Sequence, residues 1–446
     1  MVIIGLKVKY TVYVPICCFL LLANFCNGYG QDLENLNKEQ LFNINGGIRT
    51  NHVIYSGWGM KQRRDPYQYF FSANLNMKFL LWEMPLSFIY TNKKGKMHHS
   101  LNQLALRPTY KWLTLHIGKS SMGFSPYTMS GHLFQGIGAD IRPDGPWEGS
   151  AFYGMMQKPV SEDTATTPVT EPAYKRMAWG AKCTYKPNGG KMEAIVFHSA
   201  DNPESLPGEV SYPPIAEDNM VGSIRAEQKV FKCIKFQVEI ARSLMSFHFR
   251  GTDGFITGYD KKKDEQHQAL NGSIDYMSKA FTLGIKYERV DPGYRTHGAY
   301  YFNNDLENVT MQLTTGLFNQ KVQLSANSGI QRDNLDNTKM SRMNRIVGSA
   351  QVSVQPSEQF NASLSYSNFR SHTRMWRSYE DYQLTQPYED LDTLDYMQIS
   401  QNVSFQGNTQ LGNSEKIQHQ ITTFGNLQVS DNMQGSQDET NSLFLN

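Results

Sequence analysis

ENVTMQLTTGLFNQKVQLSANSGIQRDN (Glu307–Asn334) alternates apolar and polar residues along two arms that flank Asn319 and Gln320. One face of the first arm carries Val309, Met311, Leu313 and Leu317, and the other carries Thr310, Gln312 and Thr314. The second arm repeats the alternation with Val322, Leu324, Ala326 and Ile330 on its apolar face. Because side chains alternate between the two faces of a strand, this period of two predicts a long β-hairpin with a tight turn.

Similar hairpins recur at residues 220–243, 269–290 and 346–369. Their arms are about 10 to 12 residues long, which matches the length of a membrane-crossing strand and exceeds the usual five or six residues of a globular strand. Short turns alternate with long polar stretches, at residues 93–100, 158–174, 199–218, 244–266, 291–305, 331–345 and 371–390. Tight turns at one end and long loops at the other are typical of outer-membrane barrels.

The predicted fold class is therefore all-β, a transmembrane antiparallel up-and-down β-barrel with about 18 to 20 strands from Phe42 onward. A soluble repeated sandwich or a propeller remains the alternative, although the hairpins keep no fixed spacing. The mean hydropathy of -0.51 is too polar for a bundle of membrane helices. With 43 Lys plus Arg against 41 Asp plus Glu, the chain lacks the basic footprint of a nucleic-acid-binding protein, so no nucleic-acid partner is expected.

The N-terminus has the layout of a secretory signal peptide. Lys7 and Lys9 precede an apolar run at residues 10–25, and the chain turns polar from Gln31. We expect a signal peptide at residues 1–30, a short periplasmic segment at 31–41 and the barrel with long outer loops at 42–446. An apolar run of about 16 residues is short for a membrane anchor, and the bulky Phe25 before Cys26 disfavours lipid attachment. Ten polar residues before Phe42 leave no room for the plug domain of a TonB-dependent receptor.

Metal, cofactor and enzyme signatures are not found in the sequence. No clustered Cys/His spacing indicates zinc, and we expect no cofactor. Beyond the leader, Cys183 and Cys233 are either one disulfide or two small strand residues. Ser125, Ser130 and His132 lie close in sequence, but no acid is placed to complete a nucleophile–base–acid set. We therefore predict a protein that is not an enzyme.

Charged residues on the polar faces of the hairpins indicate a wet interior. A Lys facing lipid at the membrane midplane would cost roughly 2–4 kcal/mol, so these side chains are expected to face water. The predicted lumen-lining residues are Lys235, Gln237, Glu239, Lys286, Glu288, Gln312 and Gln323. Both signs of charge occur, so strong ion selectivity does not follow.

SMGFSPYTMSGH (Ser121–His132) is the segment that most suggests a functional loop. Irregular backbone at membrane depth is tolerated where it lines a cavity. One interpretation folds this segment inward as a constriction, and the other makes it a packed outer loop that ties neighbouring strands together. The candidate residues under both are Phe124, Ser125, Tyr127 and His132.

Three longer stretches carry a resemblance to a known family. NQLALRPTYKWLTLHIGKSSMGFSPYTMSGHLFQGIGADIRP (Asn102–Pro143), DPGYRTHGAYYFNNDLENVT (Asp291–Thr310) and QRDNLDNTK (Gln331–Lys339) resemble a family of Bacteroidota outer-membrane β-barrel proteins without an assigned activity. The resemblance implies location and architecture, and it supplies no functional residues. Barrels usually end on a strand with a terminal aromatic, whereas this chain ends DETNSLFLN, which suggests a fragment and a higher true strand count.

Two classes of function remain open. The first is a pore or solute-transport barrel in the cell outer membrane. The second is a non-conducting barrel that anchors outer loops for binding, or for a surface assembly or secretion complex. The expected partners are outer-membrane lipid, the barrel-assembly machinery and a surface protein or polysaccharide.

Overall fold

The computed structural model describes residues 42–55, 66–92, 102–161, 172–206, 214–248, 264–339, 341–375, 394–414, 417–434 and 438–445. These residues form a single antiparallel sheet of 21 strands, with one short 3-10 turn, η3 (Pro203–Ser205). Within these ranges, no helix is long and apolar enough to cross a membrane. The predicted signal peptide and the segment at 31–41 lie outside the described residues.

The strands follow one another along the chain. In the first half they are β1 (Phe42–Ile54), β2 (Tyr67–Phe79), β3 (Trp82–Thr91), β4 (Gln103–Leu106), β5 (Thr109–Tyr110), β6 (Leu113–Gly123), β7 (Ser130–Ile141), β8 (Trp147–Gln157), β9 (Lys175–Tyr185) and β10 (Gly190–Asn202). In the second half they are β11 (Ala216–Val230), β12 (Ile234–His248), β13 (Glu265–Met277), β14 (Phe281–Val290), β15 (Leu306–Leu317), β16 (Val322–Arg332), β17 (Ser341–Ser357), β18 (Phe360–Met375), β19 (Leu394–Ser414), β20 (Ile417–Gln434) and β21 (Asp438–Leu445).

Each strand pairs with its successor, which makes an up-and-down meander and confirms the predicted fold class. The one interruption is between β4 and β5, which together occupy one place between β3 and β6. Pro108 lies at this break, and its missing N–H cannot donate to the ladder. If β4 and β5 are counted as one broken strand, the number of strands agrees with the upper end of the predicted range.

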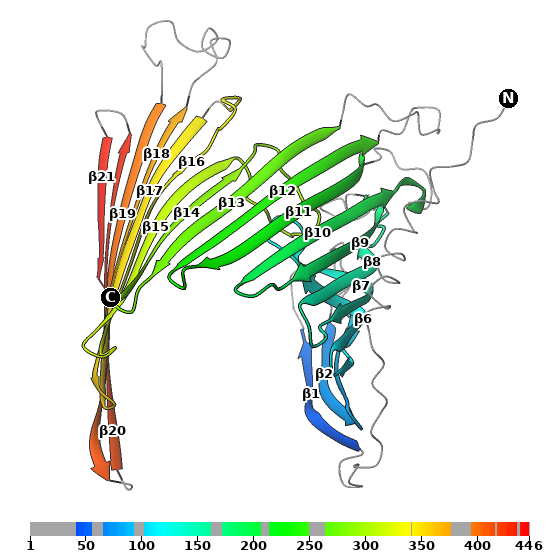
Figure 1. Ribbon diagram of the computed structural model, residues 1–446, viewed down its shortest axis with the longest axis horizontal. Helices are drawn as coiled ribbons and strands as arrows, with labels where there is room; N and C mark the ends of the chain where they lie inside the picture. The colour runs from blue at the N-terminus through cyan, green and yellow to red at the C-terminus, as the bar shows by residue number, and fades with distance from the viewer. Residues whose placement is uncertain are drawn as a thin grey trace, which may run out of the picture.

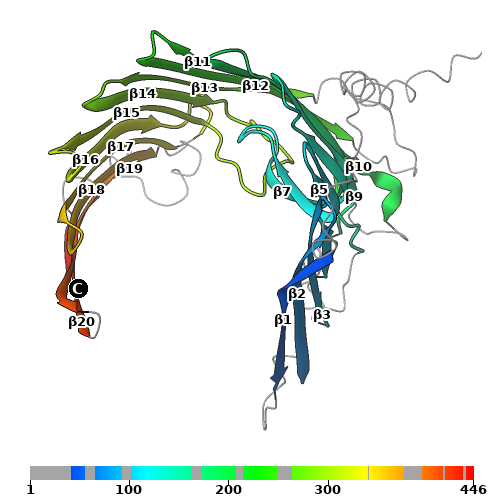
Figure 2. The same ribbon diagram turned by 60° about the horizontal axis from the view of Figure 1, so that its bottom comes forward.

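The sheet bends into an arch (Figure 1), and the view along the arch shows a concave inner side and a convex outer side (Figure 2). β1 and β21 form its two ends. Among the described residues, β1 pairs only with β2 and β21 pairs only with β20. Neighbouring strands of a sheet are twisted relative to one another, and this twist accumulates into curvature. The same curvature, continued over enough strands, closes a sheet into a barrel.

The connections are sorted by length as the sequence predicts. Tight turns follow β2, β7, β9, β11, β13, β15 and β17, whereas β8, β10, β12, β14 and β18 lead into longer connections at the opposite end. In the opening hairpin, Phe318, Asn319 and Gln320 all have left-handed backbone torsions, and Lys321 N–H donates to Phe318 O over 3.3 Å. The turn is therefore slightly longer than the Asn-Gln pair suggests.

Several strands extend further into the polar stretches than we predicted. The stretches at 199–218, 244–266 and 331–345 were expected to be loops, but β10 continues to Asn202, β12 continues to His248 and β17 begins at Ser341. Polar residues can continue a strand because those on the inner side are hydrated. Polarity alone was therefore a poor marker of where the strands end.

The two faces of the sheet separate as the alternation predicts. In the opening hairpin Val309 is opposite Ile330, Leu313 is opposite Ala326, and Gln312 is opposite Asn327. Val309, Met311 and Ile330 are 47%, 50% and 59% exposed on what we call the outer face, the convex side of the sheet. The concave side, which we call the inner face, carries Gln312 and its polar neighbours.

Cys183 lies in β9 and Cys233 in the turn between β11 and β12, and no disulfide joins them. The alternative of one disulfide is wrong, and the interpretation as small strand residues holds for Cys183 but not for Cys233, which lies in the turn. The arch is therefore held by its hydrogen-bonded ladder and by the packing on its inner face.

Candidate functional site

A row of charged and polar side chains crosses the inner face between β9 and β14. The strand register sets these residues opposite one another in the order Thr184, Glu193, Arg225, Glu239, Asn271 and Glu288. Glu193 and Glu239 are each only 4% exposed. Ser223 Oγ donates to Glu239 Oε1 over 3.2 Å, and Lys191 Nζ lies 2.8 Å from Glu193 Oε1. Each carboxylate has a nearby donor, as buried charges require.

The residues predicted to line a lumen all lie on this inner face. Successive side chains of a strand point to opposite faces, and paired residues of neighbouring strands point to the same face, so the register assigns each residue a face, which we call its parity. Lys235 Nζ lies 2.9 Å from Glu227 Oε1, and Lys286 Nζ lies 3.3 Å from Glu288 Oε2. Gln237 is opposite Glu227 on β11 and Ser273 on β13. Gln312 and Gln323 lie further along the sheet, on β15 and β16.

The connection between β6 and β7, residues 124–129, lies against the inner face, and we call it the strap (Figure 2). It is a compact turn in which Phe124 N–H donates to Met129 O over 2.8 Å, and Tyr127 N–H donates to Ser125 Oγ over 3.2 Å. Ser125 Oγ lies 3.1 Å from Thr128 Oγ1. The short hydroxyl side chains satisfy backbone and side-chain groups that no sheet partner reaches.

Tyr127 joins the strap to strands on the far side of the inner face. Its hydroxyl donates to Glu288 Oε1 over 2.6 Å and accepts from Asn271 Nδ2 over 3.1 Å. Burial, and then the hydrogen bond to Glu288, raise the pKa of Tyr127 above its usual value. The phenol therefore keeps its proton and donates a hydrogen bond to the carboxylate. This bond and the one from Asn271 link the β6–β7 connection to β14 and β13.

The connection between β14 and β15, residues 291–305, packs on the strap, and we call it the inner loop. Tyr294 Oη donates to Tyr127 O over 2.8 Å, and Thr296 Oγ1 donates to Thr128 O over 2.5 Å. Gly298 pairs with Met129 in a parallel bridge, and a Cβ at Gly298 would lie 2.1 Å from Thr128 O. Only glycine permits this approach of two backbones.

A second set of contacts fixes the inner loop to β10 and β11 through His297. Its backbone N–H donates to Asn219 Oδ1 over 3.1 Å, its Nδ1 lies 2.7 Å from Ser199 Oγ, and its Nε2 lies 3.0 Å from Glu217 Oε2. Burial lowers the pKa of His297, although the hydrogen bond to Glu217 opposes this effect. We assign the neutral tautomer that donates from Nε2 to Glu217 and accepts from the serine hydroxyl at Nδ1.

A serine, a histidine and a glutamate in contact invite comparison with a hydrolase triad. Ser199, however, is fully buried, and its neighbours on the inner face are packed side chains. A nucleophile must be reached by its substrate, so this hydroxyl acts as an anchor for His297. Glu217 also lies 3.0 Å from the guanidinium of Arg176, which in turn binds Asp201 at 2.7 Å.

The inner loop also contacts the connection between β16 and β17. Asp305 is 2% exposed; its Oδ1 accepts from Leu335 N–H over 2.8 Å, and Lys339 forms an ion pair with it. Asn334 Oδ1 accepts from Lys339 N–H over 3.1 Å, which closes that connection on itself. The three stretches that carry the family resemblance therefore meet in one interlocked group.

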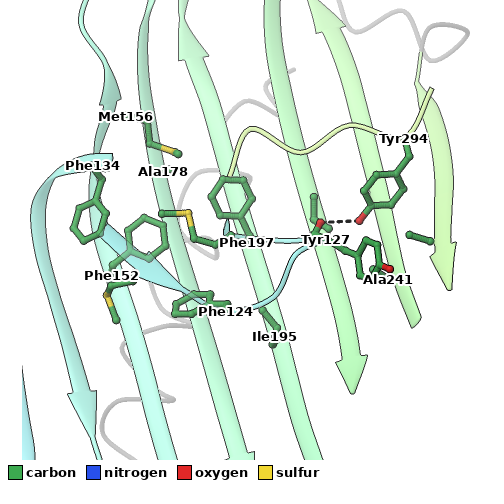
Figure 3. Close-up of a cluster of buried hydrophobic side chains, with 14 of the residues drawn as sticks. Phe124, Tyr127, Phe134, Phe152, Met156, Ala178, Ile195, Phe197, Ala241 and Tyr294 are labelled. Carbon is green, nitrogen blue, oxygen red and sulfur yellow. Dashed lines mark hydrogen bonds between the residues drawn. The ribbon is translucent and has the colours of Figure 1, made fainter. Parts of the chain in front are cut away.

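Apolar side chains fill the space between the strap and the sheet (Figure 3). Phe134 stacks on Phe152 with ring centroids 4.6 Å apart, and Phe124 lies 5.8 Å from Phe152. Phe197, Met129 and Tyr294 are fully buried in the same cluster. Burying a side chain of this size contributes on the order of 1.5–3 kcal/mol, so the cluster holds the strap firmly on the inner face.

The four candidate residues of the Ser121–His132 segment are all packed. Phe124, Ser125, Tyr127 and His132 are 5%, 5%, 2% and 9% exposed. His132 is the third residue of β7 and stacks on Tyr300 of the inner loop, with ring centroids 4.0 Å apart. The segment lies on the inner face, as one interpretation expects, and ties strands together, as the other expects, although those strands are distant in the sheet.

Sequence reasoning did not identify the partners of this segment. Glu288 was predicted only as a lining residue, and His297, Glu217 and Ser199 were not singled out. The available signal was the Asp291–Thr310 stretch, which was noted for its resemblance and not assigned a contact. Tyr127 and Glu288 are 161 residues apart in the chain, and no periodicity relates positions at such a separation.

No protein-family model matches the chain, and no curated protein matches its sequence. Similar solved structures include OccAB1 of Acinetobacter baumannii, with 12% identity, a TM-score of 0.38 and coverage of 86% of this chain and 95% of that one. OpdQ of Pseudomonas aeruginosa has 8% identity, a TM-score of 0.41 and coverage of 85% and 97%. OccK1 (OpdK) of the same organism has 10% identity, a TM-score of 0.41 and coverage of 82% and 97%.

At TM-scores this low, these similarities carry no argument about function. The proposals below are therefore argued from the geometry of the sheet and its inner face. None of the comparisons places the chain in the Bacteroidota family, so that resemblance stays a prediction.

We predict that Tyr127→Phe loosens the strap. The substitution removes the hydrogen bonds to Glu288 and Asn271 and leaves a half-buried carboxylate short of a donor, which costs roughly 1–3 kcal/mol. Urea unfolding of the protein in phospholipid vesicles measures this loss. Tyr153→Phe is the matched control, because Tyr153 is 56% exposed on β8. Equal stability of the two variants would remove Tyr127 from its linking role.

We also predict that Gly298→Ala separates the inner loop from the strap, because the new Cβ has no room beside Thr128 O. Amide hydrogen exchange should then quicken at Ser130, whose N–H donates to Gly298 O over 2.8 Å. Gly145→Ala is the control, since a Cβ there meets nothing within 4 Å. Unchanged exchange at Ser130 in Gly298→Ala would contradict the proposed close contact.

Proposed function

We propose that the chain is an outer-membrane β-barrel protein that lets polar solutes cross the membrane, with the strap and the inner loop narrowing the path. One observation carries the proposal: apolar side chains cover the outer face, while the inner face is polar and charged outside the apolar cluster that holds the strap. In a soluble sheet the apolar face would be buried. Here Ile224, Ile240 and Ile285 are 68%, 56% and 53% exposed, which suits a surface covered by lipid.

The height of the apolar band supports membrane insertion. At the end with long connections, Arg289, Glu307 and Arg332 lie opposite one another, and Tyr287 Oη donates to Glu307 over 2.7 Å. At the turn end Phe281 packs against Tyr276, with ring centroids 5.8 Å apart. Eight residue steps separate Phe281 from Arg289, about 27 Å along a strand and about 20 Å at a 40° tilt. This height is close to the roughly 25 Å apolar band of outer-membrane barrels.

The path for solutes would lie between the interlocked loops and the inner face of β15–β20. The strap and the inner loop pack on the half of the arch formed by β6–β14. On the other half, Gln312, Asn327 and Gln351 are exposed. Polar groups that face water on a curved sheet are expected for an aqueous lumen, because such side chains would otherwise be desolvated without partners.

The rest of the proposal concerns location and partners. Residues 1–30 would direct export as a signal peptide, residues 31–41 would form a periplasmic segment, and the barrel would be inserted by the assembly machinery into outer-membrane lipid. The quoted motifs support membership of a Bacteroidota family without an assigned activity. The proposed role is transport and not catalysis.

A second candidate function is a non-conducting barrel that binds a surface protein or polysaccharide. The observation that favours it is the tight packing of the strap and the inner loop, which occupy part of the interior. Tyr301, 80% exposed on the inner loop, would then be available to a partner. The uncovered polar wall of β15–β20 favours the pore instead, because a barrel that only holds its outer loops for binding does not need a hydrated inner wall.

Single-channel recording in planar bilayers separates the two candidates. The full chain, refolded and purified, should give discrete conductance steps if it forms a pore. Protein that migrates as a heat-modifiable, folded species and gives no steps would favour the binding function. Recovery as a soluble periplasmic monomer would overturn membrane insertion altogether.

We predict opposite outcomes for the same substitution on the two faces of β15. Met311 lies opposite Ile285, midway along the apolar band, so Met311→Arg should destabilise the inserted protein by about 2–4 kcal/mol. Gln312→Arg places the same charge on the inner face, where water solvates it, and should leave stability nearly unchanged. Urea unfolding in vesicles measures both, and equal losses would show that the two faces do not meet different solvents.

A further inference from the structure

The inner face of β15–β20 differs in chemistry from the inner face of β9–β14. We infer that the solutes of this pore are neutral and polyhydroxylated, of the oligosaccharide class, and that they move along the wall formed by β15–β20. This inference rests on the proposed function, since it names the solute class of the same pore. It is carried by the residues that the strand register aligns on this wall.

The first observation is an unbroken neutral row across six strands. The register places one residue of each strand opposite the next, in the order Gln312, Asn327, Ser349, Ser367, Asn402 and Gln428. Every member carries an amide or a hydroxyl, and every member is exposed or half-buried. The row lies on the same face as Glu288. Gln312 is opposite Gly284, and Gly284 is four residues before Glu288 on β14, so all three have the same face.

The neighbouring row toward the turns repeats this chemistry. It begins at Thr314 and Ser325, continues through Gln351, and ends at Asn426 on β20. Within it Ser365 Oγ lies 2.5 Å from Ser404 Oγ, so hydroxyls of adjacent strands already bind one another. Neither row contains an ionisable side chain. The row across β9–β14, by contrast, alternates Glu193, Arg225 and Glu239.

Amides and hydroxyls suit sugars better than ions. Each can both donate and accept a hydrogen bond, as each sugar hydroxyl does. An ion that loses part of its hydration shell in a narrow path needs an opposite charge in exchange, and these rows offer none. A neutral oligosaccharide can exchange its bound water for many weak contacts with the wall. Because each contact is weak, the solute can also leave, which conduction requires.

A third observation is an exposed aromatic ring at the end of the wall. Phe424 on β20 is opposite Gln406 on the inner face, and it is 65% exposed. A phenylalanine ring that is 65% exposed contributes little to packing, so its position among polar residues calls for another reason. Its face offers an apolar surface to the C–H face of a sugar ring, while Gln406 beside it can bind the hydroxyls.

Amide groups also face the other end of the arch. A cleft of about 700 Å³ is lined by the amides and hydroxyl of Asn45, Asn74, Asn76 and Ser87, and also by Arg107, His116 and Lys119. Ser87 Oγ donates to Asn74 Oδ1 over 3.0 Å, and the register continues this row to Gly118 of β6. This end of the arch therefore combines neutral donors and acceptors with the charged Arg107 and Lys119, and the two rows of β15–β20 carry the inference.

The test uses maltohexaose as a neutral oligosaccharide probe in single-channel recordings of the full chain. We expect brief current interruptions whose frequency rises with maltohexaose concentration, and weaker effects from gluconate and lysine at equal concentrations. Phe424→Ala should raise the maltohexaose concentration needed for half-block about tenfold, a change equivalent to one lost favourable contact. Its single-channel conductance in salt should persist, which reports that the variant is folded.

Phe405→Ala is the matched control, since Phe405 lies on the neighbouring strand β19 with the outer-face parity and is 41% exposed. It should leave the half-blocking concentration unchanged. Channels that are not interrupted by maltohexaose, or that respond equally to both phenylalanine variants, would overturn the solute class while leaving the pore intact. An absence of conductance steps in the unaltered protein would instead overturn the proposed function itself.

Discussion

The contacts on the inner face depend on an antiparallel ladder that keeps its side-chain parity from strand to strand. A slip of one residue would turn every side chain of a strand to the other face. On β12 it would bring Glu239 to the outer face and Ile240 to the inner face. The irregularities in register lie near strand ends, such as those at Val354/Ser357 and Leu411/Ser414. Parity is therefore preserved through the middle of the sheet, where the two faces differ most.

Given this parity, the position of the strap has an electrostatic reason. The carboxylates of the inner face that lie under or beside the loops are on β7, β8 and β10–β14, as Asp140 and Glu239 show, and a carboxylate near an apolar cluster needs a donor. Tyr127 supplies one to Glu288, and His297 supplies one to Glu217. The neutral rows of β15–β20 make no such demand, because amides and hydroxyls can be satisfied by water or by one another, as Ser365 and Ser404 are. The loops thus pack where charges need partners, and the neutral wall is left uncovered.

The sequence was sufficient for the fold class because the signal is local. In Glu307–Asn334 the period of two, the tight turn and the arm length all lie within one hairpin, and each has a direct structural cause. Strand ends were less well predicted, since hydrated polar residues continue β10 and β12 beyond the expected positions. The site was out of reach because its contacts are not local. Ser199 and His297 are 98 residues apart, and only the assembled sheet brings them together.

The interlocked loops also bear on what kind of selectivity the proposed pore would have. Tyr127 binds β13 and β14, His297 binds β10 and β11, and Asp305 binds the connection after β16. The strap and the inner loop are bonded to each other and are held to the rest of the chain at these three places. They cannot move as one lid without breaking several buried hydrogen bonds, each worth roughly 1 kcal/mol or more. The narrowing is then fixed in width. In the proposed pore, discrimination between solutes of equal size would then come from the wall opposite, where two rows of neutral donors and acceptors meet the solute. The charged Arg345 on the same face lies four residues from Ser349, toward the long connections.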